Sequence, residues 1–397
     1  MKYDILREMW WNSSSIQSFQ IEKVSLLDKK KNEKKFGIII DKLSKYMESM
    51  PKKKEELERW SEEGEIILRK YMKNDSVFKL NFMDKHIREG MIESTKKFIS
   101  EAKKFDKDMP LEDVGQAMRN VWIVNILQAI FYNEVKFSNA IFGYSMLYPY
   151  TDNYLDDINV SMKDKIEFND KLLGRLKGNM RILFETEYEK KIDRLVENIE
   201  KVFLRDKHIK VYDSLLTIQE GQIRSLMQQE NRTIPYENDI LGISIEKGSS
   251  SVLVDGYLIN GDLTQEQENF CLGYGFLLQI GDDLQDVRKD LENNHMTIMS
   301  QLAGRYDLDQ LANKLLNFTI EFIEKHIILK NKENLKILVR NNCVMLILFS
   351  IVLSKKFFSK EYIDEIEGYL PFSIDYIEEL KGKLEEKFKE KQKELSI

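Results

Sequence analysis

The sequence Gly-Tyr-Gly-Phe-Leu-Leu-Gln-Ile-Gly-Asp-Asp-Leu-Gln-Asp-Val-Arg-Lys-Asp, residues 273–290, combines an apolar helix pattern with a regular series of aspartates. Upstream, Thr264 with Gln267 three residues later predicts a capping box that opens a helix running to about Glu292. Apolar residues lie on nearly every side of this helix, so we expect it to be buried. The exceptions share one face at steps of about three or four residues: Gly275, Gln279, Asp282, Asp283, Asp286 and Asp290.

Four aspartates on one face of a buried helix require a compensating charge. At about 4 Å and an effective dielectric constant of about 20, two like charges repel by roughly 4 kcal/mol. Burial adds a desolvation cost to each carboxylate. A solvated acidic stripe is the alternative interpretation, but the apolar flanks of this helix disfavour free exposure. The pattern therefore predicts a cation site.

The composition predicts a helical protein without a general affinity for nucleic acid or anionic membranes. Hydrophobic residues make up 42% of the 397 residues, charged residues 32%, and the net charge is -6. Only five prolines occur, which favours long helices over a β-rich fold. We expect an all-α fold with an N-terminal helical extension (1–108), a catalytic core (109–355) and a charged helical tail (356–397).

The sequence also predicts a cytoplasmic protein without a transmembrane segment. Cys271 and Cys343 both lie in apolar helical stretches and provide no disulfide framework, as expected in a reducing compartment. Acidic residues interrupt the N-terminus, which lacks the apolar core of a signal peptide. The longest apolar run, Val344–Leu353, is too short to span a bilayer.

A second acidic cluster lies in the sequence Thr-Asp-Asn-Tyr-Leu-Asp-Asp at 151–157. Asp152 and Asp156 are one helical turn apart and can point the same way, with Asp157 beside them. Since the chain has no cysteine and histidine metal spacing, two carboxylate clusters favour Mg²⁺, which is usually shared with substrate phosphates. A calcium loop is the competing interpretation, but neither cluster has its alternating acids and central glycine.

A phosphate or diphosphate substrate also requires hydrogen-bond donors. Lys247 precedes Gly248 and a run of serines, which permit close approach of a ligand to the backbone. Three arginines are further candidates for donors to the diphosphate. For each of them taken alone, a surface or structural role is the alternative interpretation. These arginines are Arg119, Arg181 and Arg224, and two glutamines that could orient water, metal or ligand are Gln222 and Gln279.

The segment Gln279-Ile-Gly-Asp282-Asp283-Leu-Gln-Asp286 resembles the second aspartate-rich motif of the trans-isoprenyl diphosphate synthases. Lys247 is similar to the lysine of their Lys-Thr diphosphate site, and Gly221-Gln222 resembles their Gly-Gln helix. Asp152-x-x-x-Asp156 stands at about the right distance for the first motif. The resemblance covers roughly 115–355 and implies the all-helical class I isoprenoid synthase fold.

The resemblance further implies three magnesium ions that hold a prenyl diphosphate at the mouth of an apolar pocket. The principal metal ligands would be Asp152, Asp156, Asp282 and Asp286, with Asp157, Asp283 and Asp290 as secondary ligands. A homodimer is one option for its assembly.

Two departures from the synthase pattern concern the second diphosphate that chain elongation needs. Ile-Asn-Val-Ser-Met-Lys follows the first motif instead of Arg-Arg-Gly, and Gly115-Gln-Ala-Met-Arg119-Asn stands where the synthases carry Gly-Lys-Arg-x-Arg-Pro. The first motif is more similar to that of the bacterial large terpene synthases. The expected function is therefore a magnesium-dependent terpene synthase that ionises one prenyl diphosphate and eliminates or cyclises the carbocation. The alternatives are a prenyltransferase and a non-catalytic helical regulatory subunit.

Overall fold

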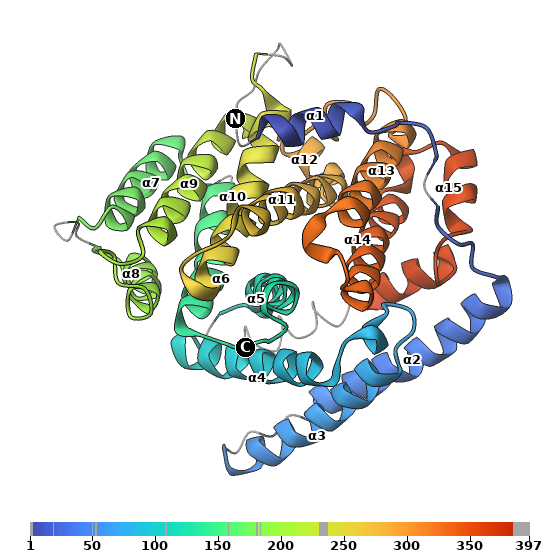
Figure 1. Ribbon diagram of the computed structural model, residues 1–397, viewed down its shortest axis with the longest axis horizontal. Helices are drawn as coiled ribbons and strands as arrows, with labels where there is room; N and C mark the ends of the chain where they lie inside the picture. The colour runs from blue at the N-terminus through green and yellow to red at the C-terminus, as the bar shows by residue number, and fades with distance from the viewer. Residues whose placement is uncertain are drawn as a thin grey trace.

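The computed structural model describes residues 3–18, 20–49, 51, 54–107, 109–157, 159–179, 182, 184–229 and 237–383. Over these residues the protein consists of helices joined by turns and loops, without any β-strand (Figure 1). The prediction of an all-α fold is confirmed. The α-helices are α1 (Asp4–Asn12), α2 (Leu26–Glu48), α3 (Lys54–Asn74), α4 (Lys85–Phe105), α5 (Leu111–Tyr132), α6 (Asn139–Asp156), α7 (Met162–Leu176), α8 (Glu187–Glu200), α9 (Ile209–Ser225), α10 (Ile240–Asn260), α11 (Gln265–Gln285), α12 (Val287–Glu292), α13 (Asp309–Lys325), α14 (Glu333–Leu353) and α15 (Lys360–Glu367). Short 3-10 helices are η1 (Leu80–Phe82), η2 (Leu226–Gln229), η3 (Ile327–Leu329) and η4 (Lys355–Phe357).

Helices α10 and α11 lie side by side, and α1, α5, α6, α9, α13 and α14 pack against one or the other of them (Figure 1). On one side α9 packs against α10, and α5 and α6 pack against α10 and each other. On the other side α11 contacts α13 and α14. Because α10 and α11 are surrounded, their sequences are apolar on most sides, as expected for buried helices.

Helix α11 begins as the sequence predicts and ends earlier. The Thr264 hydroxyl accepts a hydrogen bond from the backbone N–H of Gln267, and the side-chain carbonyl of Gln267 accepts one from the backbone N–H of Thr264. These two bonds complete the capping box. At Asp286 the backbone leaves helical geometry, with ψ of 4°, and α12 begins at the next residue. The expected single helix to Glu292 is therefore two consecutive helices.

The N-terminal helix α1 shares the core of the central bundle. Leu6 and Trp10 are buried in it. The Trp10 ring meets the edges of Phe276 in α11 and Phe318 in α13 at centroid distances of 5.7 and 5.9 Å. Helices α2 and α3 instead lie along the edge of the molecule, where α3 contacts α4 and α2 forms hydrogen bonds to residues 371 and 373 (Figure 1). The N-terminal 108 residues thus combine an element of the core with a peripheral helical pair.

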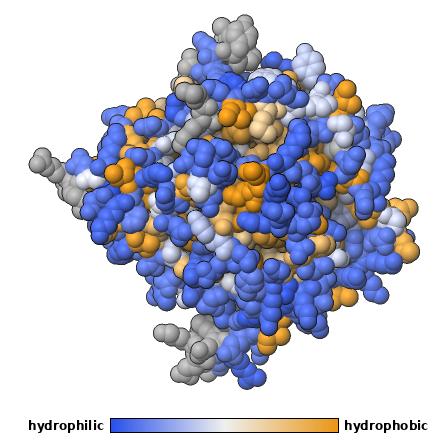
Figure 2. All heavy atoms as spheres, viewed as in Figure 1, coloured by the Kyte–Doolittle hydropathy of each residue, from blue (hydrophilic) through white to orange (hydrophobic). Residues whose placement is uncertain are grey.

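Helix α14 carries the apolar run near the C-terminus. Among the described residues, it alone has the length and hydropathy of a membrane span, and 56% of that stretch is buried inside the bundle. On the face shown in Figure 2, hydrophilic residues predominate and hydrophobic ones form small groups. In the predicted charged tail, Ile377 still contributes to the core, while residues 384–397 lie outside the described part of the chain.

Candidate active site

The two predicted aspartate clusters meet beside Lys247. Asp152 lies near the end of α6, Asp282 near the end of α11, and Lys247 on α10. The Nζ atom of Lys247 is 3.2 Å from Oδ1 of Asp152. The charge of Asp152 also acts on Asp282, so the two clusters lie within electrostatic reach of each other. The fold therefore brings together three residues that are far apart in the sequence.

The charged form of Asp282 is destabilised by its surroundings, although solvent reaches the side chain. Burial raises the pKa of its carboxyl to about 7, and the negative charges of Asp286 and Asp283 act in the same direction. Exposure and desolvation together describe a carboxylate that touches solvent while protein surrounds it on most sides. A cation that approaches from the solvent side would stabilise the charged form of this carboxylate.

Asp283 points towards α10, and both of its carboxylate oxygens accept hydrogen bonds. Its Oδ1 atom accepts a hydrogen bond of 2.9 Å from Gln279 Nε2, and its Oδ2 atom accepts one of 3.1 Å from Ser244 Oγ. The side chain is buried, and burial raises the pKa to about 6 although both hydrogen bonds lower it. Asp283, with Gln279 and Ser244, thus helps to join α11 to α10, and each of its carboxylate oxygens accepts one hydrogen bond.

Asp290, in α12, lacks a cationic partner among the described residues. Its Oδ2 atom accepts a weak hydrogen bond of 3.4 Å from Thr297 Oγ1, and His295 Nδ1 lies 3.6 Å from Oδ1. Burial, followed by the charges of Asp283, Asp286, Asp282 and Asp156, raises the pKa of Asp290 to about 8. Burial and the nearby Lys247 lower the pKa of His295 to about 4, so at neutral pH this imidazole is uncharged and supplies no compensation.

The remaining acids of the first cluster have amide partners. Asp156 Oδ1 accepts a hydrogen bond of 3.2 Å from Gln229 Nε2. Asp157 Oδ1 accepts hydrogen bonds of 2.8 and 2.9 Å from the backbone and side-chain nitrogens of Asn159. The buried Lys165 donates to Gln229 Oε1 at 3.1 Å. Burial lowers the pKa of Lys165, and the charges of Asp156 and Asp157 oppose that shift.

Three functional groups at this site were missed at the level of the sequence: Tyr148, Lys165 and Lys289. The charge of Asp152 and burial raise the pKa of the Tyr148 hydroxyl well above its usual value, and Asp282 adds to the effect. Lys289 is exposed, and its charge acts on Asp152. Tyr148 precedes Asp152 by one helical turn, so the helical period was the available signal.

The predicted arginines and Gln222 have different environments. Arg119 is exposed on α5 and its positive charge acts on both Asp282 and Tyr148, which brings it to the site. Arg224 forms an ion pair with Glu246, and Arg181 lies outside the described residues. Gln222 is buried on α9. The adjacent Gly221 faces α10, where an added Cβ would stand 3.7 Å from Cα of Lys247.

The chemistry of these side chains, but not their spacing in this conformation, favours a divalent cation. Within the described residues, no three acidic, histidine or cysteine side chains converge closely enough to hold a metal ion in this conformation. The carboxylates of two helices nevertheless lie within electrostatic reach, and their mutual repulsion contributes to the raised pKa of Asp282 and of Asp290. Oxygen ligands with excess negative charge fit Mg²⁺. The residues that would hold it are Asp152, Asp156, Asp282 and Asp286.

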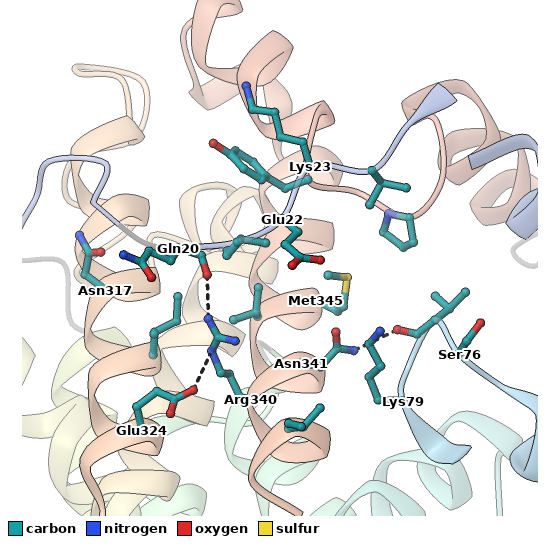
Figure 3. A pocket seen from close by; sticks show the side chains of 18 of the residues that line it. Gln20, Glu22, Lys23, Ser76, Lys79, Asn317, Glu324, Arg340, Asn341 and Met345 are labelled. Atoms are coloured by element: carbon teal, nitrogen blue, oxygen red, sulfur yellow. Dashed lines mark hydrogen bonds and ion pairs between the residues drawn. The ribbon is translucent and has the colours of Figure 1, made fainter. Parts of the chain in front are cut away.

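A large cleft of about 1320 Å³ lies elsewhere, between the N-terminal segment 14–25 and helices α13 and α14 (Figure 3). Arg340 donates to the Gln20 carbonyl at 2.8 Å and lies 3.2 Å from Glu324. Asn341 donates to the carbonyl of Val77 at 3.0 Å. None of the aspartates described above lines this cleft, and its central arginine is already paired, so the aspartate site is the better candidate for chemistry.

No family model, curated protein or solved structure matches the chain. A function has to be argued from the residues of the site.

Proposed function

We propose that this protein is a magnesium-dependent class I terpene synthase with the all-helical class I isoprenoid synthase fold. The observation that carries the proposal is the meeting of Asp152 in α6 and Asp282 in α11 beside Lys247. Such an arrangement provides negative charge for cations and a positive charge for an anion within one site. A diphosphate bridged by cations satisfies both requirements.

The substrate in this proposal is an allylic prenyl diphosphate. Magnesium ions, when bound, neutralise the diphosphate and make it a better leaving group. Lys247 donates hydrogen bonds to a non-bridging diphosphate oxygen, and Arg119 contributes positive charge from α5. As the allylic carbon–oxygen bond breaks, its electron pair leaves with the diphosphate. The carbocation then loses a proton to the departing diphosphate or to water, or closes a ring first.

Polar side chains that hold the aspartates in place orient the site without joining the reaction. Gln279 and Ser244 fix Asp283 through hydrogen bonds of 2.9 and 3.1 Å, which sets the rotation of α11 relative to α10. Gln229 holds Asp156 at 3.2 Å. Carboxylates held in this way would favour electrostatic stabilisation of a leaving group.

A prenyltransferase is the second candidate, because two further cations accompany the first cluster. Lys165 is influenced by the charges of Asp156 and Asp157, and Lys289 acts on Asp152. These lysines could hold a second diphosphate in place of the arginines that the synthases use. They act on the first aspartate cluster, however, where they also serve a single diphosphate.

The test is incubation of the purified protein with Mg²⁺ and C10 to C30 prenyl diphosphates, with and without isopentenyl diphosphate. Hydrocarbon or alcohol formed from one diphosphate alone, and lost in Asp282→Asn, would support the terpene synthase. Longer diphosphates that form only with isopentenyl diphosphate would favour the transferase instead. Asp206→Asn is the matched control, because Asp206 is an exposed aspartate in the loop after α8. Absence of turnover together with absence of Mg²⁺ binding would overturn both enzymatic proposals.

A further inference from the structure

Lys247 and Asp152 form an ion pair between α10 and α6. Their Nζ and Oδ1 atoms are 3.2 Å apart, and the two side chains are only 14% and 15% exposed. The contact is therefore a poorly solvated ion pair between the ammonium group of Lys247 and the carboxylate of Asp152.

The proposed function assigns incompatible tasks to this ion pair. Asp152 has to give an oxygen to a cation, and Lys247 has to give its protons to a diphosphate. A cation at Asp152 and the ammonium group cannot both occupy the position next to Oδ1, because two positive charges at such a distance repel each other strongly inside a protein.

The backbone offers little freedom to resolve this conflict. Gly248, the residue after Lys247, packs so closely against α11 that an added Cβ would stand 2.4 Å from Cβ of Gln279. The helix therefore cannot slide, and the rotatable part is the four-carbon side chain of Lys247. The other acid of the cluster, Asp156, contacts the neutral amide of Gln229, which carries no charge that would exclude a cation.

We propose that the Lys247–Asp152 ion pair is a lock that cation binding opens, so that the released lysine turns to the diphosphate. This inference rests on the proposed function. In the locked state Lys247 competes with the metal for Asp152, and Asp152 competes with the diphosphate for Lys247. Binding of either ligand breaks the Lys247–Asp152 ion pair, so the other ligand no longer has to break it. Metal and diphosphate consequently bind with positive cooperativity, and the coupling acts equally in both directions.

The test measures binding instead of turnover. Isothermal titration calorimetry on the full chain gives the affinity for Mg²⁺ alone and then for inorganic diphosphate at saturating Mg²⁺. For Lys247→Met, which keeps the length of the side chain without its charge, we expect Mg²⁺ to bind about 10-fold more tightly and diphosphate about 10-fold more weakly than in the wild type. Lys247→Gln provides a second variant in case Lys247→Met does not fold.

Lys289→Met is the matched control. It also removes a positive charge that acts on Asp152, but within the described residues it forms no ion pair with that carboxylate. Its expected gain in Mg²⁺ affinity is below 3-fold, as for any screened charge in solvent. An equal gain in Lys289→Met and Lys247→Met, or no gain in either, would overturn the lock while leaving the proposed metal site intact. Failure of the wild type to bind Mg²⁺ even with diphosphate would overturn the proposed function as well.

Discussion

Gly248 in α10 and Gly275 in α11 are in direct backbone contact. A Cβ atom added to Gly275 would stand 2.1 Å from the carbonyl oxygen of Gly248, and one added to Gly248 would stand 2.6 Å from the carbonyl oxygen of Gly275. The two central helices can approach this closely only because neither residue has a side chain. The contact lies one residue from Lys247, so it also fixes the distance of that lysine from α11.

Replacing Gly275 by alanine should therefore destabilise the protein. The nearest atoms are backbone atoms, which cannot move aside without separating α10 from α11, and overpacking of this kind costs about 2 kcal/mol or more. We expect a lower midpoint of urea unfolding for Gly275→Ala. Gly115→Ala is the control, since no described atom lies within 4 Å of the added Cβ and alanine favours the helix by about 0.5–1 kcal/mol. Equal stability of the two variants would contradict the close contact.

Patterns within one helix were the most predictable part of the fold. The capping box at Thr264 and the burial of α11 follow from local sequence, because they depend on residues three or four positions apart. The direction of Asp283 did not follow. It shares the acidic sequence with Asp282, yet Ser244 on α10 turns it inwards, and that partner is set by the packing of two helices.

The composition of the site was predictable only in part for the same reason. Asp152 and Lys247 could be named because each belongs to a recognisable pattern. Lys165 could not be named, because its sequence is typical of a charged surface helix and its burial depends on contact with Gln229. Arg119 and Arg224 are equivalent in the sequence, and only the fold separates a site residue from a partner of Glu246.

Asp282→Asn should stabilise the metal-free protein and remove its response to Mg²⁺. Asp286 and Asp283 repel the ionised Asp282, so an uncharged amide of the same shape relieves them. Solvent screens part of this repulsion, and the expected gain in the free energy of unfolding is about 1 kcal/mol. Thermal unfolding with and without Mg²⁺ measures both effects. A variant that is less stable than the wild type, or still stabilised by Mg²⁺, would exclude Asp282 from the cation site.

Arg119→Gln should change diphosphate binding, whereas Arg224→Gln should change stability. Arg119 is exposed and its charge acts on Asp282 and Tyr148, so Arg119→Gln should weaken diphosphate binding about 10-fold and leave stability unchanged. Arg224 is half exposed and paired with Glu246, so Arg224→Gln should cost about 0.5 kcal/mol of stability and leave diphosphate binding intact. Calorimetric titration with diphosphate and urea unfolding distinguish the two. The opposite assignment of effects would show that Arg224 is the ligand-binding arginine.

Asp255 should make stability depend on pH in a defined direction. It is fully buried on α10, and its Oδ1 atom accepts a hydrogen bond of 2.9 Å from Asn120 Nδ2. Its Oδ2 atom has no hydrogen-bond partner in the described part of the chain. Burial raises the pKa of Asp255 well above the ordinary value of 3.8, although the Asn120 hydrogen bond lowers it. The native carboxyl thus keeps its proton at a pH where the unfolded chain has released it.

The sign follows from this difference in proton binding. Below pH 4 both states are protonated and Asp255 imposes no penalty; as pH rises towards the native pKa, the stability of the wild type falls by up to about 1.4 kcal/mol per pH unit from this group. Asp255→Asn keeps an oxygen acceptor for Asn120 and does not titrate, so its advantage over the wild type should grow as the pH rises towards the native pKa of Asp255. Urea unfolding at a series of pH values from 4.5 to 7.5 measures this advantage. Asp206→Asn, at an exposed position, should show a constant difference over the same range. A constant difference for Asp255→Asn as well would mean that Asp255 is ionised in the native protein, which would contradict the prediction.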